Sequence, residues 1–163
     1  MELHEKFMQH AVKLARIALI RGDDPVGTII VLKGEVIGTG VDSVKTTKNV
    51  TNRAEIIAIN TAIEFVNSDV LKDSFLYSTR EPCLMCSYMI RHYNIPQVIY
   101  GTPIDYVGGH TSEIKVLETK EVPSWGASPA ITSGILERDI KDLSKTSINE
   151  RTTRRPLSFS WFH

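Results

Sequence analysis

The sequence predicts an α/β fold, a three-layer α/β/α sandwich with a mixed five-stranded sheet. Three observations predict it: apolar residues recur at helical spacing in several segments, β-branched runs alternate with these segments, and the first two runs are close enough to form a hairpin. The chain has 163 residues, the length of one ordinary domain, and no repeat or long linker divides it. We therefore expect one domain over residues 1–145 and a C-terminal tail over residues 146–163.

The first predicted elements are a helix and a β-hairpin. Apolar side chains recur every three or four positions through residues 7–18, which is typical of a helix with one buried face. Gly22 ends this helix, because glycine is favoured just after a helix C-terminus. Two β-branched runs follow, at 28–32 and 36–41, and Lys33-Gly34 between them predicts a two-residue turn.

The rest of the chain alternates helices and strands. Apolar periodicity and flanking turn residues decide between the two structures in each segment. Only the hairpin pair is certain from the sequence to be antiparallel, since strands joined through helices can run parallel. The predicted helices cover 54–66, 82–93, 111–119 and 135–143, and the predicted strands cover 75–79, 98–101 and 130–132.

Composition and charge exclude several function classes. Nineteen basic residues balance nineteen acidic ones, so no net field draws the protein to nucleic acid or to a membrane. The basic run at 151–155 is expected to be a solvated tail. No apolar run approaches the ~20 residues of a membrane span, and the N-terminal residues read as neither a signal nor a transit peptide. The two cysteines, three positions apart, favour a reducing compartment, and we expect a cytoplasmic protein.

Two short motifs carry the chemistry. The first is Ala54-Glu55, and the second is the segment 81–86, which reads Glu-Pro-Cys-Leu-Met-Cys. Proline suits the first turn of a helix, so Cys83 and Cys86 are expected on one face of that turn, where the helix dipole favours thiolates. Glu55 lies near the start of another helix, from which its carboxylate can meet the two sulfur atoms.

These motifs resemble the zinc-dependent cytidine deaminase superfamily, whose signature is H-x-E followed by P-C-x-x-C. The likeness extends to segments 24–27 (Asp-Pro-Val-Gly), 36–38 (Val-Ile-Gly), 77–86 and 134–136 (Gly-Ile-Leu), which look like the branch of bacterial tRNA adenosine deaminases and guanine deaminases. The resemblance covers residues 1 to about 145, so that region is expected to be a deaminase domain.

The resemblance implies hydrolytic deamination of a nucleobase or nucleoside. Cys83 and Cys86 would be zinc ligands, and Glu55 would carry a proton from zinc-bound water to the ring nitrogen and then to ammonia. Zinc lowers the pKa of its water from about 16 to about 7, which supplies hydroxide at neutral pH. The backbone around Ala54 and Pro82, including the N–H groups of Ala54 and Cys83, is implied to hold substrate or water.

The third zinc ligand of the family, a histidine, falls on Arg53. An arginine side chain stays protonated, with a pKa above ~12, and cannot ligate a metal. The neighbouring Asn52 offers an amide oxygen, which is a poor zinc ligand. We therefore expect weak or absent zinc binding and impaired activity in this chain. Our hypothesis is that Arg53 supplies a permanent positive charge in place of the metal.

Three further residues are candidates for substrate binding. The branch often has Asn after the second strand, where this chain has Asp42, which can accept hydrogen bonds but not donate them. Asp105 and His110 follow the fourth predicted strand, a loop that lies near the base in guanine deaminases. We expect a guanine- or adenine-type purine as free base or nucleoside, and balanced charge argues against tRNA.

The resemblance also implies a homodimer, and the lack of a long apolar run predicts no membrane association. The aromatic end of the tail, 158–163, is expected to pack as a terminus or dimer contact, or over the chain's own or its neighbour's site.

Other readings remain open at this point. The chain is alternatively an inactive deaminase-fold subunit or ligand-binding protein, or a thiol redox protein using its C-x-x-C pair. Glu55 taken alone is also an ordinary acidic residue of a first helical turn. Asp42, Asp105 and His110 are equally well explained as solvated loop residues.

Overall fold

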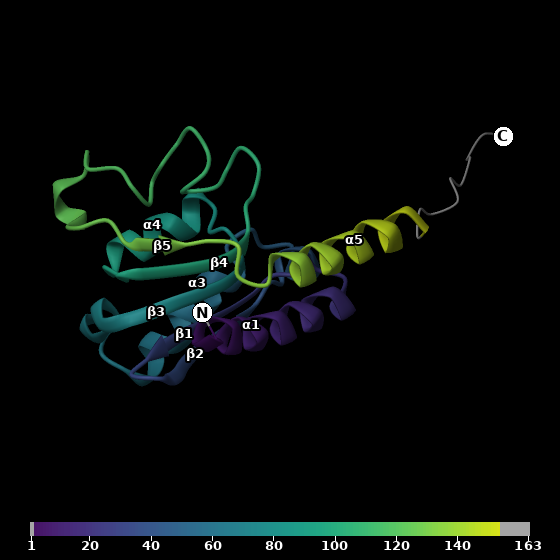
Figure 1. The fold of residues 1–163 in the computed structure, drawn as a ribbon, viewed down its shortest axis with the longest axis horizontal. Helices are drawn as coiled ribbons and strands as arrows, with labels where there is room; N and C mark the ends of the chain where they lie inside the picture. The colour runs from purple at the N-terminus through teal and green to yellow at the C-terminus, as the bar shows by residue number, and fades with distance from the viewer. Residues whose placement is uncertain (1, 154–163) are drawn as a thin grey trace.

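The computed structural model describes residues 2–153 and confirms the predicted three-layer α/β/α sandwich (Figure 1). Its five strands form one mixed sheet in the order β2-β1-β3-β4-β5. Strand β1 (Gly27–Leu32) pairs antiparallel with β2 (Glu35–Val41) and with β3 (Ser74–Arg80). Strands β3, β4 (Gln97–Thr102) and β5 (Ala130–Thr132) run parallel to each other. Because β3 and β4 are parallel, the segments that follow them leave the same edge of the sheet.

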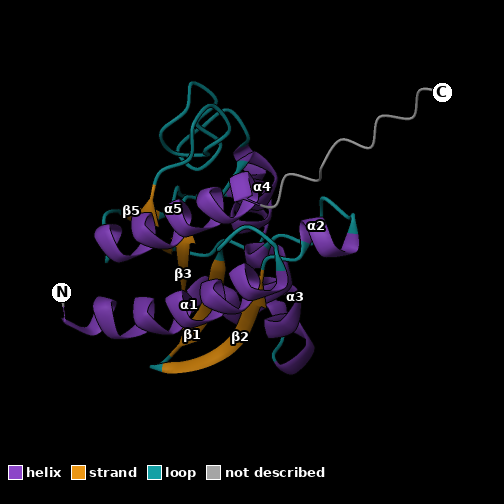
Figure 2. Ribbon diagram, turned by 90° about the vertical axis from the view of Figure 1, so that its right-hand side faces the viewer, coloured by secondary structure: helices purple, strands orange, loops and turns teal. Residues whose placement is uncertain are grey.

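Helices cover both faces of the sheet (Figure 2). On one face, α1 (Glu2–Arg21) packs beside α5 (Glu137–Thr153) and against the central strands. On the other face lie α3 (Ala54–Phe65) and α4 (Leu84–His92). No helix among residues 2–153 combines the length and the apolar character needed to cross a membrane.

The strands contribute alternate side chains to two cores. Ile29 and Tyr77 point into the core under α1 and α5, whereas Ile30 and Leu76 point into the core under α3 and α4. Both cores are apolar, so the central strands are buried on both faces. This burial explains why the strands read as continuous β-branched runs rather than as an alternating pattern.

Close packing of α3 on β2 determines where the polar residues lie. A Cβ atom at Gly40 of β2 would clash with the backbone carbonyl of Ala54, the first residue of α3. Glycine at this position therefore lets the helix start directly against the strand. As a result Asp42, just after β2, lies beside Arg53, just before α3.

The predicted helix over 111–119 is wrong, because this segment forms turns. Some of its backbone groups form turn hydrogen bonds with one another, such as the N–H groups of Glu118 and Thr119 to the carbonyl of Lys115, and others bond to buried side chains. The Arg91 guanidinium donates hydrogen bonds to the carbonyl oxygens of Val116, Leu117 and Thr119. A carbonyl oriented toward Arg91 is directed away from the N–H that an α-helix would offer it.

Two helix boundaries also differ from the prediction. Helix α4 begins at Leu84, so Cys83 is its N-cap residue, and Pro82 precedes the helix with its carbonyl oxygen bonded to the N–H of Gly109. Helix α5 begins at Glu137 and continues to Thr153, whereas the helix was predicted over 135–143. The aromatic end of the predicted tail lies outside the described residues.

Three short helices lie in segments for which the sequence predicted neither a helix nor a strand. They are α2 (Val44–Thr47) and the 3-10 helices η1 (Ser68–Asp73) and η2 (Pro123–Trp125). Helix α2 is held from outside: the buried Asp23 carboxylate accepts bonds at 2.9 Å from the N–H groups of Lys45 and Thr46. This contact positions the loop that joins Asp42 to Arg53.

Candidate active site

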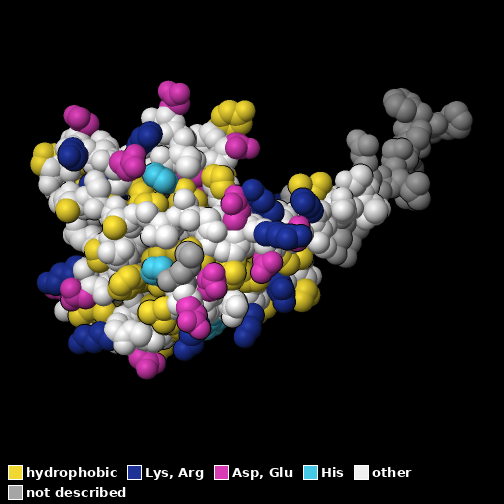
Figure 3. Space-filling model, viewed as in Figure 1, with side chains coloured by type: hydrophobic (Ala, Val, Ile, Leu, Met, Phe, Trp, Pro, Cys, Tyr) yellow, Lys and Arg dark blue, Asp and Glu magenta, His cyan; other side chains and the backbone are white. Residues whose placement is uncertain are grey.

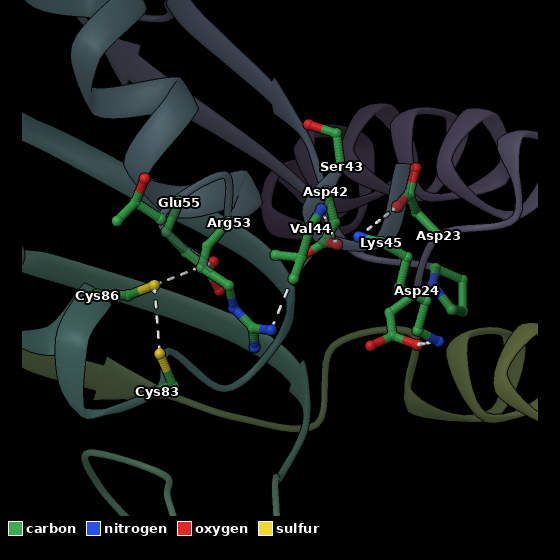
Figure 4. A network of polar contacts seen from close by, with 12 residues as sticks. Asp23, Asp24, Asp42, Ser43, Val44, Lys45, Arg53, Glu55, Cys83 and Cys86 are labelled. Carbon is green, nitrogen blue, oxygen red and sulfur yellow. Dashed lines mark hydrogen bonds and ion pairs between the residues drawn. The ribbon is translucent and has the colours of Figure 1, made fainter. Parts of the chain in front are cut away.

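The two sequence motifs meet where α3 and α4 begin (Figure 4). The Oε2 atom of Glu55 lies 3.4 Å from the Sγ atom of Cys86, and this sulfur lies 3.5 Å from Sγ of Cys83. Glu55 and Cys86 are buried, whereas Cys83 is partly exposed. Both cysteines are free thiols. The structure therefore brings together the predicted catalytic carboxylate and both predicted metal-binding thiols.

Hydroxyl groups from the sheet orient the Glu55 carboxylate. Ser78 of β3 donates a hydrogen bond of 3.0 Å to Oε1 of Glu55, and Thr28 of β1 donates one of 3.1 Å to the Ser78 hydroxyl. Thr28 and Ser78 are direct partners in the β1–β3 register and are both fully buried. The sequence analysis did not single out Ser78. Its signal is a hydroxyl residue at an inward position of an otherwise apolar strand.

Burial and hydrogen bonding shift the pKa values of these groups in different directions. Burial raises the pKa of Glu55, although its own backbone N–H and Arg53 oppose the rise. The hydrogen bond with Cys86 is the main cause that lowers the pKa of Cys83 to about 5. The same bond, together with burial, raises the pKa of Cys86 well above its usual range. Cys83 is therefore a thiolate at neutral pH, and Cys86 is a thiol.

Arg53 lies between the thiols and Asp42 (Figure 4). Its Nη1 atom is 3.9 Å from Oδ2 of Asp42, and 18% of its side chain is exposed. Burial lowers the pKa of the guanidinium, but Glu55, Cys83 and Asp42 together raise it, and the net shift is upward. The guanidinium is thus held as a permanent cation among acidic groups.

Asp42 is a buried carboxylate at the opposite side of Arg53. Its Oδ1 atom accepts a hydrogen bond of 3.3 Å from the N–H of Val44, and only 1% of the residue is exposed. Burial raises its pKa from 3.8 to about 6, and Arg53 opposes this rise. An ionised carboxylate is unfavourable in such a place unless a cation lies nearby.

Glu81 attaches the loop after β4 to the start of α4. Its buried carboxylate accepts hydrogen bonds from the N–H groups of Ile104, His110 and Thr111 and from the Thr111 hydroxyl. A Cβ atom at Gly108 would clash with this carboxylate. Glu81 belongs to the motif over residues 81–86, but no role was predicted for it. A carboxylate at the inner end of a buried strand is the signal that identifies it.

The other predicted substrate residues are placed differently. The His110 side chain bonds to the hydroxyl of Tyr100 at 2.8 Å and lies 3.5 Å from Glu118. Asp105 is exposed. Among residues 2–153, no hydrogen bond or ion pair joins either side chain to Arg53, Glu55 or the two thiols. Their role in binding substrate stays a prediction.

Ala54 is the first residue of α3, as predicted, Pro82 lies two residues before α4, and both are buried. The carbonyl oxygen of Pro82 accepts bonds from the Ser87 hydroxyl at 3.2 Å and from the N–H of Gly109. Ala54 directly precedes Glu55, and Pro82 directly precedes Cys83, so the backbone of both residues lies next to the site.

The donor set does not fit a three-ligand zinc site. Among the described residues, no group of three or more His, Cys, Asp or Glu side chains is arranged to hold a metal ion. Catalytic zinc sites use three protein ligands and leave one position for water. Here two thiols are available beside Glu55, and the charged side chain that acts on all three is the Arg53 guanidinium, which cannot ligate.

Comparisons with known proteins agree with the fold and the motifs. Residues 1–102 match the model of the cytidine and deoxycytidylate deaminase zinc-binding region. The tRNA-specific adenosine deaminase 2 of Xenopus laevis is 31% identical over 160 residues, which cover 94% of this chain and 91% of that protein.

Two solved structures give the same result. One, from a study of A-to-I editing by tRNA:A34 deaminases at the wobble position, superposes with a TM-score of 0.77 at 30% identity, covering 85% of this chain and 98% of that one. Guanine deaminase from Bacillus subtilis superposes with a TM-score of 0.58 at 35% identity, covering 61% of this chain and 64% of that one. The chain therefore belongs to the cytidine and deoxycytidylate deaminase family and has tRNA adenosine deaminases and guanine deaminases among its relatives.

Proposed function

We propose that this chain binds a purine base, in a nucleoside or in transfer RNA, and that its own deaminase activity is impaired by Arg53. Family membership supports hydrolytic deamination as the ancestral chemistry. The relatives act on adenosine in tRNA or on guanine, so their names support a purine as the ligand.

One observation carries the impairment: the Arg53 guanidinium lies among Glu55, Cys83 and Asp42, directly before the Ala54-Glu55 motif. Its charge acts on the same groups that a metal ion would bind or neutralise. Even a lost hydrogen-bond partner of a metal ligand lowers affinity about 10–100-fold, and a missing ligand has a larger effect. When bound, zinc supplies an activated water in this family, and among residues 2–153 the ligands offered to it at this site are the two thiols.

The chain's own residues still provide a polar site for a base. Glu55 is held by Ser78 and its raised pKa favours the protonated form, which can donate a hydrogen bond to a ring nitrogen. We assign Asp42 the role of accepting hydrogen bonds from the base or sugar. Ala54 and Pro82 contribute backbone, and Asp105 and His110 are proposed contacts from the loop after β4.

The relatives favour adenosine in tRNA over the free base, contrary to the argument from charge. The face drawn in Figure 3 carries both signs of charge intermixed, and the whole chain is neutral. Binding to an RNA backbone needs a local basic surface rather than a net charge. We therefore include a tRNA anticodon stem-loop among the ligands to be tested. As the resemblance implies, we also propose a homodimer acting in the reducing cytoplasm.

Elemental analysis of zinc and a deaminase assay test the proposal together. We expect far less than one zinc per chain and no deamination of adenosine, guanine or the stem-loop. Arg53→His should bring zinc close to one per chain and give activity, while Arg53→His with Glu55→Ala should keep zinc and lose activity. Purine binding without deamination by the unaltered chain would support the inactive, ligand-binding alternative.

The contrary result is equally clear. One zinc per chain in the unaltered protein, with deamination that depends on Glu55, would show that two thiols suffice and that Arg53 does not impair the site. Failure of the unaltered chain and of Arg53→His to bind any of the three ligands would reject the purine assignment.

A second candidate function is favoured by the two sulfur atoms. They lie 3.5 Å apart, and the partly exposed Cys83 has the lower pKa, an asymmetry typical of redox pairs. With hydrogen peroxide as oxidant, the two thiols would lose two hydrogen atoms to form a disulfide, and the peroxide would become two waters. Mass spectrometry before and after dithiothreitol tests this: a reversible loss of two hydrogens supports it, and overoxidation of Cys83 without a disulfide rejects it.

A further inference from the structure

The site contains four acidic or thiol groups and one cation. Asp42, Glu55, Cys83 and Cys86 all act on the charge of Arg53. Among residues 2–153, no other Lys or Arg side chain forms a hydrogen bond or ion pair with any of these four groups. The guanidinium is therefore the positive charge that acts on the Asp42 carboxylate and the Cys83 thiolate.

The contact between Arg53 and Asp42 is electrostatic rather than a hydrogen bond. At 3.9 Å the Nη1 and Oδ2 atoms are too far apart to share a hydrogen, and both Oδ2 of Asp42 and Nε of Arg53 are buried without a hydrogen-bond partner. A lone buried carboxylate is unfavourable, and a nearby opposite charge reduces that penalty. Each residue thus lowers the free-energy cost of burying the charge of the other.

The chain connects the two residues through one short, tied loop. Asp42 follows β2 and Arg53 precedes α3, and the N–H of Ser43 bonds to the carbonyl of Asn52 at 3.0 Å, which closes the loop at its base. This bond keeps the backbone at Asp42 close to the backbone at Arg53. A change in the charge of one residue therefore changes the electrostatic energy of the other.

We propose that Arg53 and Asp42 are a compensated pair, in which the guanidinium replaces a metal ion as the structural positive charge of the site and Asp42 is its matched buried counter-charge. This inference rests on the proposed impairment of zinc binding. In such a pair, removal of Arg53 alone leaves the buried Asp42 carboxylate without a compensating positive charge. The fold of this chain is then independent of metal.

A double-mutant cycle tests the pair. Urea unfolding is measured at pH 7.5 with EDTA for the unaltered chain, Arg53→Met, Asp42→Asn and the double variant. We expect Arg53→Met to lower the folding equilibrium constant at least tenfold, about 1.4 kcal/mol. With Asp42→Asn already present, the same change should lower it less than threefold. Arg53→Lys is the matched control that keeps the charge and should stay close to the unaltered chain.

Each outcome of the cycle either supports or contradicts the pairing of Arg53 with Asp42. Equal effects of Arg53→Met in both backgrounds would overturn the pairing, because independent sites add. If Arg53→Met does not fold, folding of the double variant would support the pair, and failure of both to fold would contradict it. If Arg53→Lys is destabilised as much as Arg53→Met, packing rather than charge is responsible for the loss of stability.

The metal arm uses the same unfolding assay with and without zinc. The unaltered chain should unfold at the same urea concentration in EDTA and in zinc, whereas Arg53→His should become more stable with zinc. Destabilisation of the unaltered chain by EDTA would overturn the inference. Purine binding is measured separately by calorimetry, so loss of the proposed function and loss of the charge pair give different results.

Discussion

The carboxylate of Glu81 binds Thr111 at two points: the Thr111 N–H donates to Oε1 at 2.7 Å and its hydroxyl donates to Oε2 at 2.6 Å. Glu81 is the first residue after β3, in the connection to α4, and Thr111 lies in the loop after β4. Because Cys83 is two residues from Glu81, this contact joins the loop to the thiol-bearing helix. The start of α4 and the loop after β4 are therefore joined through Glu81.

Glu81→Gln should destabilise the protein by roughly 2 kcal/mol or more. The glutamine amide would place an N–H₂ group against N–H donors from the loop and leave buried groups unsatisfied. Urea unfolding measures the loss. The matched control is Glu137→Gln, because Glu137 is 42% exposed and pairs with Lys141 on the surface, where the expected change is about 0.5 kcal/mol or less. Similar losses in both variants would contradict the proposed role of Glu81.

Gly108→Ala should displace the same loop. The new Cβ atom would overlap the Glu81 carboxylate, which is fixed by its four hydrogen bonds and cannot move aside. We expect a loss of roughly 1–3 kcal/mol in unfolding free energy. In a Glu81→Ala background the clash disappears, so the substitution should be nearly neutral there. A loss of the same size in both backgrounds would show that the clash is elsewhere.

Arg91→Lys should loosen the segment over residues 116–126. Three carbonyl oxygens lie 3.0 Å from Nη1 of Arg91, Nη2 donates to a fourth, and the guanidinium lies 5.2 Å from the Trp125 ring. A lysine ammonium cannot reproduce this planar arrangement. We expect faster hydrogen exchange in the segment and a loss of roughly 1–3 kcal/mol. Arg138→Lys, at an exposed position, should change neither quantity.

Cys83 should react with iodoacetamide as a thiolate down to mildly acidic pH. Its pKa is lowered to about 5, chiefly by the hydrogen bond with Cys86, so the thiolate is complete above pH 6 and is lost as pH falls through 5. The labelling rate at Cys83, followed by mass spectrometry in EDTA, should be nearly constant between pH 6 and 8. Cys86 is buried with a raised pKa and should stay unlabelled. A rate that rises tenfold per pH unit up to pH 8 would contradict the lowered pKa.

Asp42 should make the fold less stable as pH rises from 4 to 7. Its folded-state pKa of about 6 exceeds the unfolded value of 3.8, so the folded protein binds the proton more tightly in this range. The stabilisation is complete below pH 3.8 and is lost as pH rises through 6. Relative to Asp42→Asn, the unaltered chain should lose roughly 1–2 kcal/mol between pH 4 and 7, allowing for solvent screening. Parallel pH profiles for the two proteins would disprove this contribution.

The sequence predicted most of the fold because its signals are local. Periodic apolar residues and turn residues located α1, the hairpin and α3 to within a few residues. They located β5 at its observed bounds. The loop over 111–119 was mispredicted because its conformation depends on Arg91 and Glu81, which are distant in sequence. The extension of α5 through Thr153 was missed for lack of a strong apolar stripe.

The candidate site divides in the same way. The sequence by itself determined the residue types: a carboxylate, two thiols three apart, and an arginine before Ala54-Glu55 that no metal can use as a ligand. Only the tertiary structure decided that Arg53 lies 3.9 Å from Asp42 and that Ser78 orients Glu55. The physical reason is distance along the chain: local patterns specify helix ends, whereas burial and long-range packing determine which charges meet there and how their pKa values shift.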